Sequence, residues 1–244
     1  MKLHWIDELR PLPPTHLAMP PQSEAPGLLA AGGRLTVERL EEAYRRGIFP
    51  WYSANQPVLW WSPDPRMVLQ TRAFKVSRSL RKTLKKFIAD PACEIRIDHS
   101  FDRVMQLCAE TPRDGQHGTW IVPAMQRAYR TWHRAGRVHS VETWINGELV
   151  GGLYAVAIGH MVFGESMFSL RTDASKIALS ALVAFCRAHG VVAIDCQQNT
   201  RHLSSLGAFE VPRDLFERML ALGLGGGAIR DWAYHPSHWS HLEL

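Results

Sequence analysis

The pattern of hydrophobic and polar residues changes near residue 66. Ten of the fifteen prolines lie before residue 67, and the aromatic segment 48–66 is punctuated by X-Pro pairs, which favour extended backbone over helix. Residues 36–47 are the exception, because a threonine cap, early glutamates, late arginines and a final glycine predict an amphipathic helix. We therefore expect residues 1–66 to form a small N-terminal domain and residues 67–244 a larger one.

After residue 66 the periodicity alternates between helix and strand. Helical spacing predicts helices over residues 77–88, 101–109, 123–135 and 174–189, and alternation predicts strands over 138–145, 149–158, 160–169 and 191–197. Asn146-Gly147 joins the first two strands and is a strong hairpin signal. The order of hairpin, strand, helix and strand predicts an α+β fold, in which helices pack on a mixed sheet as in acyltransferase-like proteins. The apolar stripe expected on the first of these helices is Leu80, Leu84, Phe87 and Ile88.

Composition narrows the class of protein. Hydrophobic residues make up 46% of the chain and charged residues 21%, which is ordinary globular composition, and the net charge of +5 allows one basic docking face. Acidic residues near the N-terminus argue against a signal peptide, and the weakly charged run 150–163 is too short to span a membrane. We expect a cytoplasmic monomer with no membrane partner. The cysteines show no metal or disulfide spacing, and the histidines form no H-E-x-x-H motif, so we expect no metal.

The strand predicted over residues 191–197 carries the first candidate chemistry. A period of two places Asp195 and Gln197 on one face at the end of this strand, where ligands of α/β sheets usually bind. The carboxylate can hold the amide's NH₂ and leave its carbonyl oxygen to accept a proton-bearing group. The residues alone leave open a plainer interpretation, in which Asp195 caps a turn and Gln197 belongs to a polar loop.

A second candidate is Glu165, which lies between Phe163 and Met167. In a core this carboxylate would be costly unless it paired with a cation or acted in a pocket. The alternative is that it faces water on an alternating strand. Glu142 carries the same ambiguity and a weaker claim.

Basic and aromatic residues form the third and fourth candidates. The helix over 77–88 places four cations along one face, with no acid between residues 72 and 87, as phosphate docking requires; the alternative is a solvated helix face. Trp51 follows a Phe-Pro step and Trp120 lies in a glycine-flanked loop, so both rings are candidates for stacking on unpaired bases. We expect Trp60 and Trp61 to be packed instead. The four cations are Arg78, Arg81, Lys82 and Lys85.

Coenzyme A chemistry lacks its usual loop. No glycine occurs between Glu165 and His189, whereas a pyrophosphate loop needs glycines so that its N–H groups can approach the phosphates. We therefore expect neither coenzyme A nor any other cofactor, which disfavours an acetyltransferase. A non-catalytic RNA-binding module that uses the basic helix and the aromatic rings is the remaining alternative to an enzyme.

Several motifs in order resemble a known family. They are GLLAAGGRLTVERLEEAYRRGIFPWY, LWWSPDPR, GTWI, HSVE, GGLYAV, FGESMFS, ASK and IDCQ, spread over residues 27–212. Together they are similar to bacterial leucyl/phenylalanyl-tRNA–protein transferases. The resemblance implies a small N-terminal domain joined to a domain similar to the GNAT acyltransferases. It also implies transfer of leucine from leucyl-tRNA or phenylalanine from phenylalanyl-tRNA, with weaker transfer of methionine. The acceptors are proteins with N-terminal Arg or Lys, and the transfer marks them for degradation.

The resemblance also implies a role for each candidate residue. Asp195 and Gln197 match the catalytic pair, with Gln197 positioning the acceptor's amine, and the group that takes the proton stays open. Glu165 matches the partner of the acceptor's cationic side chain. Trp51 and Trp120 would contact the terminal adenosine, and Arg78, Arg81, Lys82 and Lys85 would follow the phosphates of the acceptor stem.

An aminoacyl pocket in such an enzyme should be apolar. Selectivity between leucine and smaller aliphatic residues is limited, because one methylene is worth about 1–3 kcal/mol, but β-branched isoleucine and valine should transfer very poorly. The residues placed where such a pocket would be lined, each of which could also be plain core, are Leu153, Val162, Leu179, Leu182 and Ile194.

Overall fold

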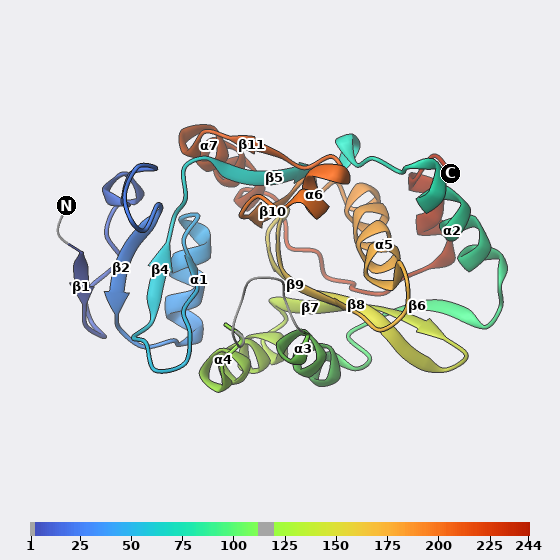
Figure 1. Cartoon of the computed structure of the whole chain (residues 1–244), viewed down its shortest axis with the longest axis horizontal. Coiled ribbons are helices and arrows are strands. Elements are labelled where there is room, and N and C mark those ends of the chain that lie inside the picture. The colour runs from blue at the N-terminus through green and yellow to red at the C-terminus, as the bar shows by residue number, and fades with distance from the viewer. Residues whose placement is uncertain (1–2, 112–119) are drawn as a thin grey trace.

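Two β-sheets lie side by side along the long axis of the molecule (Figure 1). The computed structural model describes residues 3–111 and 120–244. The smaller sheet has the order β1-β2-β4-β3, with β1 parallel to β2 and the other neighbours antiparallel. Beside it lies α1 (Val37–Arg45), which begins at Thr36 as predicted, because the Thr36 side chain accepts a 3.2 Å hydrogen bond from the backbone N–H of Arg39. The strands are β1 (His4–Ile6), β2 (Leu28–Gly32), β3 (Phe49–Pro50) and β4 (Leu59–Trp61).

The larger sheet has the order β11-β5-β10-β9-β8-β7-β6. Its neighbours are antiparallel except for β9 and β10, which run parallel and are joined by the crossover helix α5 (Ala174–Ala188). The predicted α+β fold with a mixed sheet is therefore confirmed. The strands are β5 (Arg66–Gln70), β6 (Cys93–Ile97), β7 (Val138–Ile145), β8 (Glu148–Ile158), β9 (Met161–Ser169), β10 (Ala193–Gln197) and β11 (Phe209–Val211).

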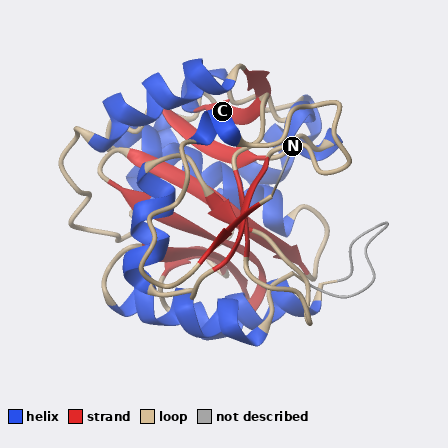
Figure 2. Ribbon diagram, turned by 90° about the vertical axis from the view of Figure 1, so that its left-hand side faces the viewer, coloured by secondary structure: helices blue, strands red, loops and turns tan. Residues whose placement is uncertain are grey.

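Helices cover both faces of the larger sheet (Figure 2). On one face lie α3 (Phe101–Glu110) and α4 (Pro123–Arg134), and on the other lies α5, next to α2 (Arg78–Ala89). No helix among the described residues combines the length and the hydrophobicity that crossing a bilayer requires. The remaining short or terminal helices are η1 (Thr15–Leu17), η2 (Thr71–Ala73), α6 (Arg201–Ser205), α7 (Arg213–Leu224) and η3 (Pro236–His241).

One aromatic core joins the two sheets. The Tyr44 ring of α1 meets Phe163 of β9 at 5.0 Å and Trp132 of α4 at 5.3 Å, both edge to face. These buried rings belong to the cluster on the α3–α4 face of the larger sheet. The chain thus changes sheet between Trp61 and Arg66, close to the predicted boundary, and a division into domains at residue 66 stays a prediction.

The predicted apolar stripe of α2 is wrong at one position. Leu80, Leu84 and Phe87 are buried, but Ile88 is 41% exposed, because α2 packs through a narrow face. The C-terminal segment, whose position was not predicted, covers that face. Trp239 contacts the Phe87 ring at 6.3 Å, and Leu242 is buried in the same cluster.

The close approach of α5 to β8 depends on Gly151. A Cβ at this position would lie 2.5 Å from Ala174 Cβ and 2.7 Å from the Ala174 carbonyl carbon. Gly151→Ala should therefore lower the free energy of unfolding by about 1–3 kcal/mol through overpacking, as measured by urea denaturation. Gly164→Ala is the matched control, because the nearest described atoms outside its chain neighbours lie 3.7 Å from its Cβ position, which is ordinary van der Waals contact. Equal stability of the two variants would contradict this packing argument.

Candidate functional site

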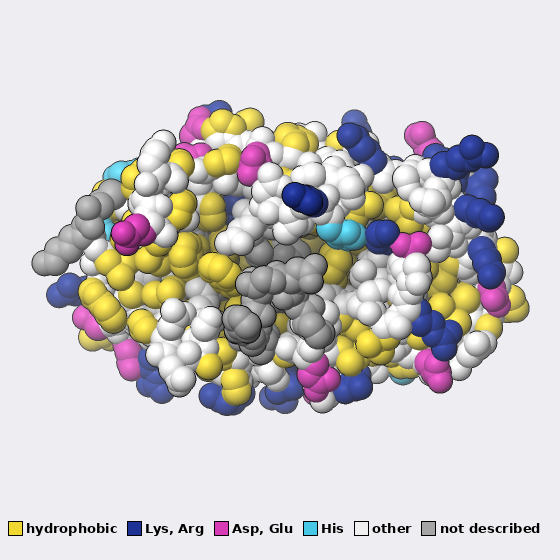
Figure 3. Space-filling view, in the orientation of Figure 1, with side chains coloured by type: hydrophobic (Ala, Val, Ile, Leu, Met, Phe, Trp, Pro, Cys, Tyr) yellow, Lys and Arg dark blue, Asp and Glu magenta, His cyan; other side chains and the backbone are white. Residues whose placement is uncertain are grey.

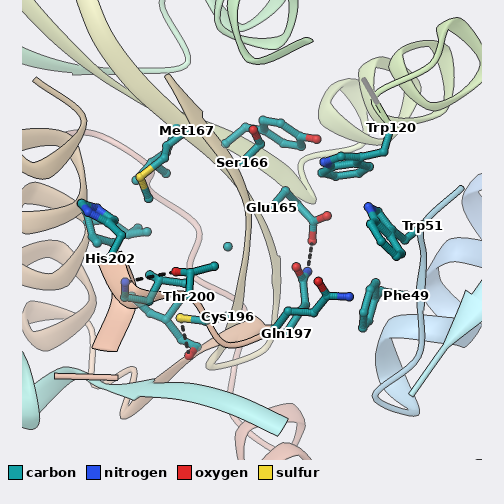
Figure 4. Close-up of a pocket in the computed structure, with 18 of the residues that line it drawn as sticks. Phe49, Trp51, Trp120, Glu165, Ser166, Met167, Cys196, Gln197, Thr200 and His202 are labelled. Carbon is teal, nitrogen blue, oxygen red and sulfur yellow. Dashed lines mark hydrogen bonds between the residues drawn. The ribbon is translucent and has the colours of Figure 1, made fainter. Parts of the chain in front are cut away.

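A cavity opens where the parallel strands β9 and β10 part. The two strands are paired only at Ile194 with Val162 and at Asp195 with Phe163. Beyond these pairs, residues 164–167 of β9 and residues 196–198 line a cavity of about 290 Å³. In Figure 4, Phe49 and Trp51 approach it from the small sheet, while Met167 and His202 lie across it. We call this the central cavity.

Its polar residues come from irregular points of both strands. In β9, Ala155 faces Gly164 and Tyr154 faces Ser166, so Glu165 is the extra residue of a β-bulge. In β10, Asp195 faces Val68 and Gln197 faces Met67, so Cys196 is extra, and Gln197 has a φ of +61°. Such bulges redirect side chains, and they are common next to active sites. Simple alternation along either strand therefore does not describe the site.

Glu165 points into the structure, so the interpretation that it faces water is wrong. Its carboxylate accepts hydrogen bonds from Tyr44 Oη at 2.7 Å, Gln197 Nε2 at 3.0 Å and Tyr129 Oη at 3.3 Å. The two hydroxyl groups also lie 2.5 Å apart, and burial raises the pKa of both tyrosines, which keeps them protonated. Burial likewise raises the pKa of Glu165 to about 8, against these hydrogen bonds. None of the described lysines or arginines forms an ion pair with it.

Asp195 is fully buried and bound to Arg66. Its carboxylate receives a bidentate ion pair from Arg66 Nε at 2.8 Å and Nη2 at 2.6 Å. It also accepts a 2.9 Å hydrogen bond from the backbone N–H of Gln197. The prediction that this carboxylate holds the Gln197 side-chain amide is wrong, because that amide donates a hydrogen bond to Glu165. Asp195 instead holds the bulge that presents Gln197.

The apolar wall includes four of the five predicted pocket residues. Leu153, Leu179, Leu182 and Ile194 line the central cavity. Val162 does not, because it is fully buried opposite Ile194 where the two strands still pair. The sequence missed Met167, Cys196 and Leu203, whose approach depends on the bulges and on the turn into α6.

His202 is a further wall residue that the sequence did not indicate. Its Nε2 is buried and has no hydrogen-bond partner among the described residues. Burial, with a smaller contribution from Lys176, lowers the pKa of His202, so the ring is neutral at pH 7. A neutral ring keeps this wall free of charge.

Two half-buried tryptophans stand at the mouth of the cavity. Trp51 and Trp120 both line it, and the Trp51 ring meets Trp61 edge to face at 5.4 Å. Trp60 and Trp61 are buried, which confirms that they are packed. The rest of the loop predicted before Trp120, residues 115–119, lies outside the described residues.

The four cations of α2 do not line the central cavity. Arg78, Lys82 and Lys85 are exposed, and basic side chains gather over the end of the molecule that α2 covers (Figure 3). Arg81 is half-buried and donates to the backbone oxygen of Glu243. A role of this helix in RNA binding stays a prediction.

Glu142 lies outside the site. It is fully buried, and its carboxylate accepts hydrogen bonds from the Ser100 backbone at 2.7 Å, Ser140 Oγ at 2.7 Å and Trp144 Nε1 at 2.9 Å. Because Ser100 precedes α3, this carboxylate fixes the start of that helix. No group of three or more His, Cys, Asp or Glu side chains in the described part of the chain is arranged to hold a metal ion.

Comparisons with known proteins identify the family. A family model described as leucyl/phenylalanyl-tRNA protein transferase matches residues 68–221, and a model of the N-terminal domain of that transferase matches residues 33–64. A protein of Methylibium petroleiphilum is 63% identical over 96% of this chain and 88% of its own length. One of Leptothrix cholodnii is 61% identical over 95% and 91%. Both are named leucyl/phenylalanyl-tRNA–protein transferase.

Solved structures give a weaker likeness. The crystal structure of FemX aligns with a TM-score of 0.44 at 10% identity over 71% of this chain and 66% of that chain. The fold and the cavity define a mixed-sheet α+β protein that can bind an apolar group where two parallel strands part. The sequence comparisons are more specific: the chain belongs to the leucyl/phenylalanyl-tRNA–protein transferase family.

Because the ion pair between Arg66 and Asp195 is buried, breaking it should lower the free energy of unfolding. Arg66→Met leaves a buried, unpaired carboxylate, so the free energy of unfolding at pH 7 should fall by about 3–5 kcal/mol. Adding Asp195→Leu removes the stranded charge and should restore most of that loss. Urea denaturation of the three proteins measures both steps. Equal losses in the single and double variants would show that the charge is not what matters.

The raised pKa of Glu165 predicts a pH-dependent stability. The unfolded carboxyl titrates near its ordinary 4.5 and the folded one near 8, so stability falls as pH rises between these values. Glu165→Gln does not titrate, and its stability relative to the wild type should increase from pH 5 to pH 8. Urea denaturation at pH 5, 6.5 and 8 tests this. A difference in stability between Glu165→Gln and the wild type that does not vary with pH would contradict the raised pKa of Glu165.

Proposed function

We propose that this chain is an aminoacyltransferase that moves leucine or phenylalanine, and methionine more weakly, from tRNA to the N-terminal Arg or Lys of a protein. The observation that carries the proposal is the apolar central cavity, which ends at Glu165, a carboxylate with no cationic partner among the described residues. Membership of the transferase family supplies the reaction class. An aminoacyl ester combines an apolar side chain with a reactive carbonyl, which suits such a cavity.

The cavity offers a separate place for each part of the reactants. The aminoacyl side chain would lie against Leu153, Leu179 and Ile194, where only dispersion and burial reward binding. Trp51 and Trp120 would hold the terminal adenosine by stacking, a contact worth about 1–3 kcal/mol per base. The ester then lies between the rings and the apolar wall, next to Gln197.

The acceptor would bind through its positive charge. Glu165 has a pKa near 8 without its ligand, so it is largely protonated at neutral pH. A guanidinium or ammonium group beside it favours the carboxylate, lowers that pKa and so replaces the bound proton with the acceptor's charge. An uncharged N-terminal side chain offers no such compensation. Selection for N-terminal Arg or Lys follows from this exchange.

Gln197 would align the attacking amine. Its Nε2 is engaged by Glu165, so its Oε1 can accept a hydrogen bond from the acceptor's α-amine. After the ammonium loses one proton, the nitrogen forms a bond to the ester carbon. The bond from that carbon to the adenosine oxygen breaks, and the leaving oxygen takes the second proton of the amine. An amide is a poor base, so we assign Gln197 to alignment, with Asp195 positioning it.

The product would carry a leucine or phenylalanine ahead of its original N-terminus. Such a residue serves as a degradation signal, which gives the reaction a place before proteolysis in the cytoplasm. We also propose that the protein acts as a monomer.

The direct test is transfer of labelled leucine from leucyl-tRNA to two peptides that differ only in an N-terminal Arg or Gly. Label should appear on the Arg peptide and be abolished by ribonuclease treatment of the donor. Gln197→Ala should lower kcat by about 10²-fold, because misalignment of the amine costs rate and not binding.

As a control, the affinity of Gln197→Ala for tRNA is measured, and it should equal that of the wild type. Retention of leucyl-tRNA with no label on either peptide would favour the RNA-binding module. Equal labelling of both peptides would remove the acceptor role from Glu165.

A further inference from the structure

A second cavity of about 640 Å³ lies at the other end of β10 from Gln197. It is bounded by η2, α2, the end of α5 and the C-terminal segment. Val192 is part of its wall and lies five residues before Gln197, one of which is the bulge residue Cys196, so four strand steps at about 3.3 Å each place it roughly 13 Å from Gln197. The central cavity and this one are therefore separate sites.

Three arginines line this second cavity, which we call the arginine groove: Arg72, Arg81 and Arg187. Among the described residues none of them forms an ion pair with a carboxylate. Most of the other described arginines with hydrogen-bonded side chains form an ion pair with Asp or Glu, as Arg45 does with Glu41. Three cations around one groove, none of them ion-paired with a described carboxylate, form a site for an anion.

Arg187 is held in place by neutral groups. Its Nε and Nη2 donate to the Thr71 carbonyl at 3.0 and 2.7 Å, and its Nη1 donates to the His241 carbonyl at 2.6 Å. A guanidinium carries five N–H donors, so two stay available for a ligand. The half-buried group is thus oriented without being neutralised, which is the arrangement that bidentate phosphate binding uses.

The other two arginines extend this charge toward solvent. Arg81 donates to the Glu243 backbone oxygen, and Arg72 is exposed, with no side-chain partner among the described residues. The Glu243 side chain also stands at the rim, exposed and unpaired with these arginines. Arg81 belongs to α2, so the groove continues into the basic surface of that helix.

We propose that the arginine groove binds a backbone phosphate of the tRNA donor, upstream of its terminal adenosine. This inference rests on the proposed function, because that function makes RNA the donor. The separation of roughly 13 Å from Gln197 means that the bound phosphate is not the one next to the ester. The phosphate contact fixes the RNA without reading its sequence.

The experiment compares two donors that differ in phosphate content: leucyl-tRNA and leucyl-adenosine, which carries the same ester and no phosphate. Arg72→Gln should raise KM for leucyl-tRNA several-fold and reduce the slope of log binding constant against log salt by about 1. With leucyl-adenosine its kcat/KM should equal that of the wild type. Arg218→Gln, which removes an exposed arginine of α7, is the matched control and should change neither donor.

Arg187→Lys provides the second variant, because it keeps the charge and loses the planar fork. It should weaken the binding of leucyl-tRNA and leave kcat/KM with leucyl-adenosine unchanged. The loss of the planar fork that bonds the Thr71 and His241 carbonyls should also lower the urea midpoint slightly. Equal loss with both donors would make Arg187 a structural residue, and a salt slope for Arg72→Gln equal to that of Arg218→Gln would overturn the proposal. If the wild type transfers leucine from neither donor, the proposed function fails, and the salt slope of direct tRNA binding still tests the groove.

Discussion

The buried ion pair between Arg66 and Asp195 is the constraint on which the site depends. Its guanidinium lies 4.7 Å from the Phe49 ring and 4.6 Å from the Phe216 ring, and it also donates to the Gly47 carbonyl at 3.0 Å. One side chain thus joins the small sheet, α7 and the bulge of β10. A buried ion pair adds little net stability compared with apolar residues of the same shape, but it fixes orientation. Here the orientation it fixes is that of Gln197, through the second hydrogen bond to Asp195.

The cavity itself follows from an interruption of pairing. Once β9 and β10 stop pairing after Phe163 and Asp195, the space between the two strands can hold a ligand. A regular sheet would have closed this space with hydrogen bonds between the strands. The bulge at Glu165 then turns a carboxylate inward, where two tyrosines from α1 and α4 can reach it. The strained Gln197 backbone and the high pKa of Glu165 are both costs that the surrounding core must offset.

Features set by local sequence were predictable, and features set by distant contacts were not. The Thr36 cap, the Asn146-Gly147 hairpin and the helices follow from neighbouring residues, and the structure confirms them. Strands β5, β6 and β11 and helices α6 and α7 were not predicted; β6 and β11 are edge strands, which carry a weak periodic signal. Alternation along a strand cannot reveal a bulge, so it left the direction of Glu165 open. Its partner Tyr44 lies 121 residues earlier, and only the folded core joins them.

Charge is distributed unevenly between the central cavity and the arginine groove. The central cavity is kept almost neutral: His202 is deprotonated by burial, Asp195 is matched by Arg66, and Glu165 holds a proton until a cation replaces it. A cavity of this kind accepts an uncharged ester and an apolar side chain without desolvating a fixed charge. Under the proposed function, the polyanionic part of an RNA donor would be bound elsewhere, and the arginines that pair with no described carboxylate lie at the far end of β10. Separating the two tasks would let phosphate contacts strengthen donor binding without placing cations beside Glu165, where they would compete with the acceptor.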